Sequence, residues 1–154
     1  AQFAIAAGVE LTHVPYRGQP GAALALLQGD VDLFFNQTGP AIPMIRQGQV
    51  RGLAVTTRAR VAALPDVPTV EEACGLPGFE STTWYGIFGP ANLPQRLSTE
   101  ITRIIREPDF QRWLIENQGI TPPSVFTPRE FAEIQRRDVA RWAEVVRRSG
   151  ATVD

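Results

Sequence analysis

The 154-residue sequence predicts an α/β fold, and three observations lead to that prediction. Residues 9–57 alternate between short β-prone runs and short helical runs, an order typical of β-α-β units. The run 31–35 is apolar on both faces, as central strands of a helix-covered parallel sheet are. The last third of the chain, in contrast, has helical periodicity and no strand of its own.

The expected elements follow one another along the chain with clear breaks between them. Strands are expected over residues 9–15, 31–35 and 51–57, and a β-branched and aromatic run predicts a fourth over 81–88. Short helices are expected over 3–7, 22–28, 41–47 and 70–73, and three of them end at a glycine: Gly8, Gly29 and Gly48. Longer helical runs are expected from Pro94, over 109–117, and from Thr127 to Ser149.

Two helix starts have a recognisable capping pattern. Thr69 and Thr127 are each followed three residues later by a glutamate, Glu72 and Glu130, which is the spacing of a capping box. We therefore expect both threonines to begin helices.

Composition excludes several classes of protein. The 15 basic residues are all arginine and are balanced by 16 acidic residues, so no basic excess exists to bind nucleic acid. No run approaches the roughly 20 apolar residues of a membrane span, and no signal peptide is recognisable. Cys74 and His13 are the single cysteine and single histidine. They form no metal-ligand cluster or nucleophile–base pair, so we expect no metal, no cofactor and no catalytic residue.

Two polar loops are the candidate ligand-binding elements. They follow the first and second predicted strands, so both are expected at the carboxyl edge of the sheet, where open α/β sheets bind ligands. Backbone N–H groups at a helix start favour anions, and an arginine can pair with a carboxylate through two hydrogen bonds. From the residues alone, an ordinary strand-to-helix turn is the favoured interpretation, because helix starts of this kind are common. The candidate residues are Tyr16, Arg17, Gly18, Gly21 and Ala22 in the first loop, and Asn36, Gln37 and Thr38 in the second.

Many short motifs in consistent register resemble one family, the substrate-binding receptors of tripartite tricarboxylate transporters, or Bug proteins. They include AGVELTHVPYRG at 7–18, GDVDLFF at 29–35, RGLAVTT at 51–57, LPDVPTV at 64–70, GLPGFE at 75–80 and WYG at 84–86. The resemblance covers essentially the whole chain and implies the carboxyl-terminal half of a receptor with a type II periplasmic-binding-protein fold. It implies no enzymatic activity.

The resemblance also implies a division of the chain and a role for it. Residues 1–80 would form a second-lobe α/β unit with a parallel-rich sheet, 81–91 a crossover strand, and 92–154 helices that return to pack on a first lobe. Such receptors are periplasmic, bind small organic anions such as di- or tricarboxylates or amino acids, and deliver them to membrane permease subunits. The loop residues named above would then contact the ligand.

Departures from the usual family pattern concern the candidate site. The family commonly has Lys where this sequence has Arg17, Pro at Gly21, Asp at Ala25 and Asp at Asn36. A neutral Asn36 would favour anionic ligands by removing like-charge repulsion. Two other hypotheses stay open: an enzyme on an α/β sheet, and a truncated domain that hides its apolar helix faces in a homodimer and retains no ligand binding.

Overall fold

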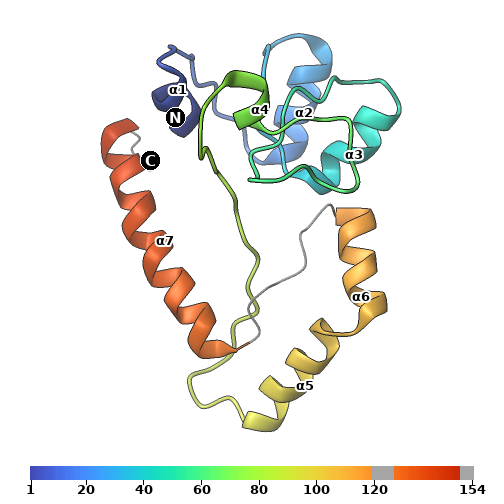
Figure 1. Cartoon of the computed structure of the whole chain (residues 1–154), viewed down its shortest axis with the longest axis vertical. Helices are drawn as coiled ribbons and strands as arrows, with labels where there is room; N and C mark the ends of the chain where they lie inside the picture. Colours follow the sequence, from blue (N-terminus) through green and yellow to red (C-terminus); the bar gives the residue numbers. More distant parts are fainter. Residues whose placement is uncertain (119–126, 150–154) are drawn as a thin grey trace.

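The computed structural model describes residues 1–118 and 127–149. Its helices are α1 (Gln2–Ala7), α2 (Gln19–Gln28), α3 (Thr38–Arg46), α4 (Val70–Cys74), α5 (Gln95–Ile105), α6 (Pro108–Trp113), the π-helical turn η1 (Leu114–Gln118) and α7 (Pro128–Ser149). Helices α1 to α4 gather in one unit, from which an extended segment leads away to α5 (Figure 1). Helix α7 runs back toward the amino-terminal unit.

Several helix ends agree with the signals in the sequence, whereas α2 and α3 begin at Gln19 and Thr38, three residues before the starts expected at 22 and 41. Gly8 and Gly29 end α1 and α2 in the left-handed conformation, with φ of 65° and 81°. Both predicted capping boxes form: the Thr69 hydroxyl accepts the Glu72 N–H at 3.1 Å, and the Thr127 hydroxyl accepts the Glu130 N–H at 3.2 Å. These side chains satisfy N–H groups that a helix start leaves without an intrahelical partner.

The predicted parallel sheet is not formed by the residues that the structure describes. The runs 9–15, 31–35 and 81–88 have no ladder, and the run 51–57 contributes one isolated parallel bridge between Val55 and Thr69. Leu11, Leu33 and Leu53 are 45%, 46% and 54% exposed. A parallel sheet is stable when helices cover both of its faces. These three leucines are about half exposed, so the described part of the chain does not supply the full covering layer that the prediction assumed.

A small core nevertheless holds the amino-terminal unit together. Ile42 on α3 packs with four apolar residues from the segment between α3 and α4: Val55, Val61, Leu64 and Val67. Gly52 passes close to this cluster, since a Cβ atom there would lie 2.9 Å from Val67 Cγ2. The N–H of Val55 donates to Pro68 O at 2.8 Å, and the N–H of Val70 donates to Val55 O at 2.9 Å. The 51–70 segment therefore folds back on itself against α3.

A separate aromatic cluster attaches α1 to this unit. The ring of Phe3 lies 5.6 Å from that of Phe35 and 6.1 Å from that of Phe79, measured between centroids. Such tilted and edge-on contacts add to the burial of the rings themselves.

Helix α7 packs along the extended segment 80–88. The Trp84 and Phe88 rings lie 4.9 Å and 5.5 Å from the Phe131 ring. Arg141 on α7 and Gln2 on α1 both donate hydrogen bonds to the Glu80 carbonyl oxygen. Helix α7 thus touches the extended segment 80–88 and lies next to α1, near the start of the chain (Figure 1).

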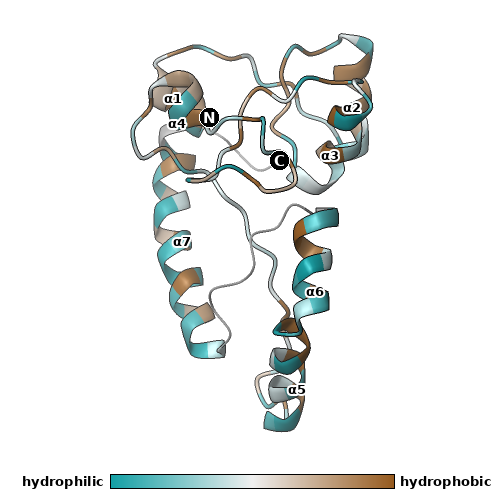
Figure 2. Cartoon of the chain, turned by 45° about the vertical axis from the view of Figure 1, so that its right-hand side comes forward, coloured by the Kyte–Doolittle hydropathy of each residue, from teal (hydrophilic) through white to brown (hydrophobic). Residues whose placement is uncertain are grey.

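The carboxyl-terminal helices carry apolar residues among polar ones (Figure 2), and several of the apolar side chains are exposed. Leu97 and Ile104 on α5, Trp113 on α6 and Val146 on α7 are 40–49% exposed. The described residues therefore leave about half of the Trp113 side chain uncovered. Among those residues, no helix is both long and apolar enough to cross a bilayer.

Candidate functional site

The first candidate loop ends in a glycine that sets the direction of α2. Gly18 is the N-cap of α2 with φ of 84°, a conformation that L side chains rarely adopt. Its N–H donates to the Tyr16 carbonyl at 2.9 Å, which closes a tight turn. A glycine cap has no side-chain acceptor, and α2 begins without a side-chain cap hydrogen bond. The positive end of a ten-residue helix is therefore not neutralised by a side chain of the loop.

Gly21 and Ala22 lie in the first turn of α2, and Tyr16 packs beside them. A Cβ atom built on Gly21 would lie 3.8 Å from Tyr16 Cδ1, an ordinary van der Waals distance. The protein itself therefore has room for a methyl group at Gly21. Tyr16 is 39% exposed, so its ring forms a wall of the turn while one side faces solvent.

Arg17 is the charged member of the first loop. Its side chain is exposed, and it makes no hydrogen bond or ion pair with residues 1–118 or 127–149. A guanidinium in this condition can form two parallel hydrogen bonds with a carboxylate from solution.

The second loop leads into α3, which begins earlier than the sequence predicts. We expected a turn over 36–40, whereas the helix starts at Thr38 after Gln37 as N-cap. The Asn36 side-chain oxygen accepts the Gln37 N–H at 2.8 Å, so the Asn36 amide group points its NH₂ donors elsewhere. Like α2, α3 begins without a side-chain cap hydrogen bond. Asn36, Gln37 and Thr38 are all half-buried.

The two candidate loops lie in the same unit, but each is organised by its own contacts. Within the described ranges no hydrogen bond joins residues 16–22 to residues 36–38. The structure brings Tyr16, Gly18 and Gly21 together in one turn and places Asn36 against Gln37 in the other. The shared carboxyl edge of a sheet was predicted to bring the loops together, and the described residues do not form that sheet.

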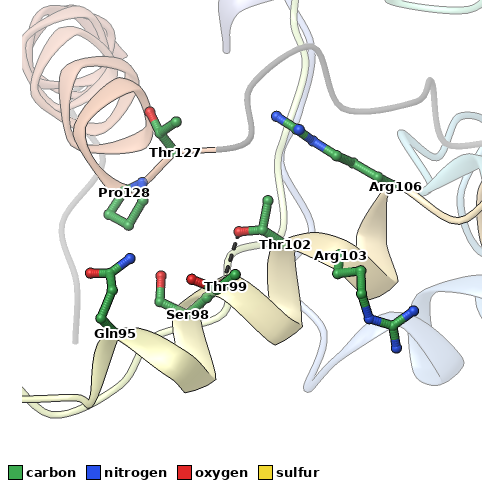
Figure 3. A pocket seen from close by; sticks show the side chains of 8 residues that line it. All are labelled: Gln95, Ser98, Thr99, Thr102, Arg103, Arg106, Thr127 and Pro128. Atoms are coloured by element: carbon green, nitrogen blue, oxygen red, sulfur yellow. Dashed lines mark hydrogen bonds between the residues drawn. The ribbon is translucent and has the colours of Figure 1, made fainter.

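Two open hollows lie outside the predicted site, at the carboxyl-terminal helices. One of about 420 Å³ is lined by Gln95, Ser98, Thr99, Thr102, Arg103, Arg106, Thr127 and Pro128 (Figure 3). The other, of about 300 Å³, is lined by Thr82, Thr83, Trp84, Gln135, Asp138, Val139 and Trp142. The sequence did not predict the first hollow. One local indication was available, because Ser98 and Thr102 lie one helical turn apart and therefore share one polar face of α5.

Two of the polar side chains that line the larger hollow are already engaged by neighbouring groups. Thr102 Oγ1 donates to the Ser98 carbonyl of its own helix at 2.9 Å. The Arg103 guanidinium pairs with Glu100 at 2.7 Å and Glu107 at 2.5 Å, which raises the pKa of Arg103 above its usual value. The positive charge of Arg103 is therefore largely compensated.

Cys74 and His13, the single cysteine and single histidine, both lie at the surface. Cys74 is exposed at the end of α4. His13 is exposed in the run 9–15, where a strand was predicted. Residues 1–118 and 127–149 contain no group of three or more His, Cys, Asp and Glu side chains placed to hold a metal ion.

Solved structures with the same architecture define the class of protein. A structure of an R. palustris protein with adipate superposes with a TM-score of 0.85 at 29% identity, covering 97% of this chain and 50% of that chain. MatC from Rhodopseudomonas palustris with bound malate gives a TM-score of 0.79 at 31% identity, over 94% of this chain and 51% of MatC. The periplasmic binding protein BugD gives 0.81 at 31% identity. The fold is that of the periplasmic binding proteins.

The family model for the tripartite tricarboxylate transporter family receptor matches residues 1–151. The chain belongs to this receptor family, as the sequence motifs predicted. It is 38% identical over 150 residues to a UPF0065 protein from the tcbD-tcbE intergenic region of Pseudomonas sp. (strain P51), covering 95% of this chain and 44% of that protein. It is 30% identical to BugT of Bordetella pertussis, covering 97% of this chain and 46% of BugT. The chain thus spans about half the length of these relatives.

Proposed function

We propose that this chain supplies one half of an extracytoplasmic receptor that captures small organic carboxylates for a tripartite tricarboxylate-type transporter. The observation that carries the proposal is the start of α2. There an exposed Arg17, which pairs with none of the described residues, precedes a helix whose first N–H groups have no side-chain cap.

Both features of the α2 start attract the same kind of ligand. Helix N-termini stabilise anions through their N–H groups and through the aligned peptide dipoles. An adjacent guanidinium adds a charge-assisted pair that suits the planar shape of a carboxylate. The nearly neutral chain, with 15 basic and 16 acidic residues, offers no general attraction for anions. Selection must therefore depend on these local donors.

The second loop extends the site with neutral donors. The Asn36 oxygen is occupied by the Gln37 N–H, so the amide NH₂ is the part of Asn36 left for a ligand. Gln37 and Thr38 stand at the second uncapped helix start. We propose that Tyr16, Arg17, Gly18, Gly21 and Ala22 bind one end of an organic anion, and that Asn36, Gln37 and Thr38 bind it from the α3 side.

The relatives support the ligand class and the compartment. Solved neighbours carry adipate or malate, which are both dicarboxylates, and BugD is described as a periplasmic binding protein. We propose a periplasmic location for this chain, a di- or tricarboxylate or amino acid as ligand, and membrane permease subunits as the partners that receive it. Binding without chemical conversion agrees with a family of receptors.

We propose the following division of the chain. Residues 1–80 form a second lobe, 81–91 cross between lobes, and 92–154 return to pack on a first lobe. The exposed apolar side chains of the expected strands, and of α5 and α6, support this division because such side chains are normally covered. We further propose that the parallel sheet is completed once that covering layer is present.

Calorimetric titration with a set of ligands tests the proposal. Adipate, malate and citrate would be titrated into the chain alone and into a composite receptor in which it replaces the segment of MatC that it matches. A diamine of adipate length serves as the cationic control. We expect saturable binding of at least one carboxylate by the composite, weaker binding by the chain alone, and none of the diamine. A composite that unfolds cooperatively but binds no carboxylate would contradict the proposal.

A further inference from the structure

Helix α6 continues directly into the π-helical turn η1, and one side chain explains the change of register. Asn117 donates its side-chain N–H to the Trp113 carbonyl oxygen at 3.1 Å. In an α-helix that oxygen accepts the backbone N–H four residues on, which is the N–H of Asn117 itself. The side chain thus takes an acceptor of the α-helical register, and this favours the wider turn. π-Helical turns are rare and occur frequently at functional sites.

The π-helical turn packs against α3, which belongs to the amino-terminal unit. Among the described helices, η1 contacts α6, which it continues, and α3. Its first two side chains, Leu114 and Ile115, are half-buried, whereas Trp113 just before them is 49% exposed. The end of α6 approaches the amino-terminal unit at α3 in both views (Figure 1 and Figure 2). The turn therefore joins the carboxyl-terminal helices to α3.

This contact connects two parts of the chain that the proposed function assigns to different lobes. Residues 1–80 include α3 and are proposed as the second lobe, and residues 92–154 include η1 and are proposed to pack on the first. The chain superposes on the adipate-bound neighbour over 97% of its length, so both parts match that structure in one superposition. Lobes that enclose a ligand move apart when it leaves. A contact between them adds its free energy only to the arrangement in which it forms.

Helix α3 also carries part of the proposed ligand site. Asn36, Gln37 and Thr38 form its start, and Ile42, one turn further on, lies in the core of the amino-terminal unit. The helix is therefore fixed to that unit and moves with it. Because a ligand at the start of α3 and the turn η1 both act on the position of this helix, their effects are coupled, and the coupling is reciprocal.

We propose that η1 is a latch, formed by residues 114–118 seated on α3, that stabilises the closed arrangement of the lobes and retains the ligand. Asn117 is a positioning residue in this latch, because its hydrogen bond sets the register that places Leu114 and Ile115 next to α3. The inference rests on the proposed division of the chain into lobes. A latch that forms only on closure slows release of the ligand and has little effect on its entry, since the ligand enters the open arrangement.

A distance measurement on the chain itself tests the latch without any ligand. Spin labels on Cys74, exposed at the end of α4, and on an introduced Arg96→Cys, exposed on α5, report the separation of the two parts. We expect a narrow distance distribution for the labelled chain and a broader one for Leu114→Ala/Ile115→Ala. Circular dichroism shows whether the variant is folded. Asn117→Ala, which keeps both aliphatic side chains, should broaden the distribution in the same direction.

The matched control is Leu97→Ala/Ile104→Ala, which removes the same two side-chain types from α5. These residues are partly exposed on a helix that packs on α6, so the distribution should stay narrow. A distribution that is already broad in the labelled chain overturns the proposal. A folded latch variant and a folded Asn117→Ala variant that both keep the narrow distribution overturn it as well.

Binding kinetics in the composite receptor test the coupling to the ligand. The probe is the tightest binder among adipate, malate and citrate. We expect Leu114→Ala/Ile115→Ala to raise the dissociation rate about fivefold or more and to leave the association rate nearly unchanged, whereas the α5 control changes neither. An unchanged dissociation rate, or an equal change in both rates, overturns the proposal. A composite that binds no carboxylate contradicts the proposed function instead, and the distance measurement then decides on the latch.

Discussion

Trp84 donates its indole N–H to the Asp138 carboxylate of α7 at 2.7 Å, across 54 positions of sequence. The same indole ring meets Phe131 edge-on, with an interplanar angle of 87°. These two contacts join the extended segment 80–88 to α7. They are the basis of the first two predictions.

Asp138→Ala should destabilise the chain by about 1 kcal/mol, because it removes a hydrogen bond to a charged acceptor at a site still partly open to water. Asp138→Asn keeps an acceptor at the same place and should lose less. Urea unfolding followed by circular dichroism measures both. An alanine variant as stable as the asparagine variant would show that the hydrogen bond contributes nothing to stability.

Gly86→Ala should destabilise the chain by about 1–3 kcal/mol, the usual cost of forcing extra volume into a packed contact. The added methyl would lie 2.4 Å from Phe131 Cζ, so the ring must move. Phe131→Leu in the same chain removes the obstructing ring atoms and should recover part of the loss. Thermal unfolding of the two single variants and the double variant gives the coupling between the positions. Purely additive effects would contradict close contact at this point.

The capping box of α4 should make stability depend on pH. The pKa of Glu72 is lowered by the backbone hydrogen bond at Thr69 and by the side-chain hydrogen bond from Arg60. A lowered pKa in the folded state contributes stability that is complete above the ordinary glutamate pKa and is lost as the pH falls through the lowered value. Unfolding midpoints of wild type and Glu72→Gln should therefore differ at pH 7 and converge in acid. A constant difference from pH 7 to pH 3 would contradict this cause.

Alanine substitutions of the two glycines in the first loop should distinguish a role in backbone conformation from a role in close approach of the ligand. Gly18→Ala places a side chain at φ of 84° and should lower stability by about 1 kcal/mol or more. Gly21→Ala meets nothing closer than 3.8 Å and should leave stability nearly unchanged. If the ligand approaches the α2 backbone closely, Gly21→Ala weakens carboxylate binding. Gly29→Ala, strained at φ of 81° at the far end of α2, is the control that should lose stability without losing affinity.

Local signals in the sequence predicted the helices, whereas the predicted sheet is not formed by the described residues. Thr69 and Thr127 began helices as expected, since a capping box depends on residues three positions apart. The strands were inferred from apolar runs such as 31–35, and such runs show only that a segment can be covered. Leu33 and Leu53 stay exposed because covering them requires contacts that the sequence of the run does not encode.

That polar loops lead into α2 and α3 was predictable from the sequence, whereas the binding role of their residues stays a prediction. The sequence predicted a helix from Ala22, but α2 begins at Gln19 with Gly18 as N-cap. Pro20 in the first turn suits this earlier start. The early start of α3 at Thr38 and the Asn36–Gln37 hydrogen bond depend on the loop conformation. The Trp84–Asp138 contact joins residues far apart in the chain, and no local pattern indicates it.

Calorimetry of an Arg17→Gln variant tests most directly whether Arg17 and the start of α2 bind a carboxylate. In the composite receptor, we expect Arg17→Gln to weaken dicarboxylate binding at least about tenfold, since a charge-assisted pair contributes about 1.5–3 kcal/mol. Arg51→Gln, which removes another exposed arginine outside both loops, should leave the affinity unchanged. Equal affinity for wild type and both variants would contradict a carboxylate site at the start of α2.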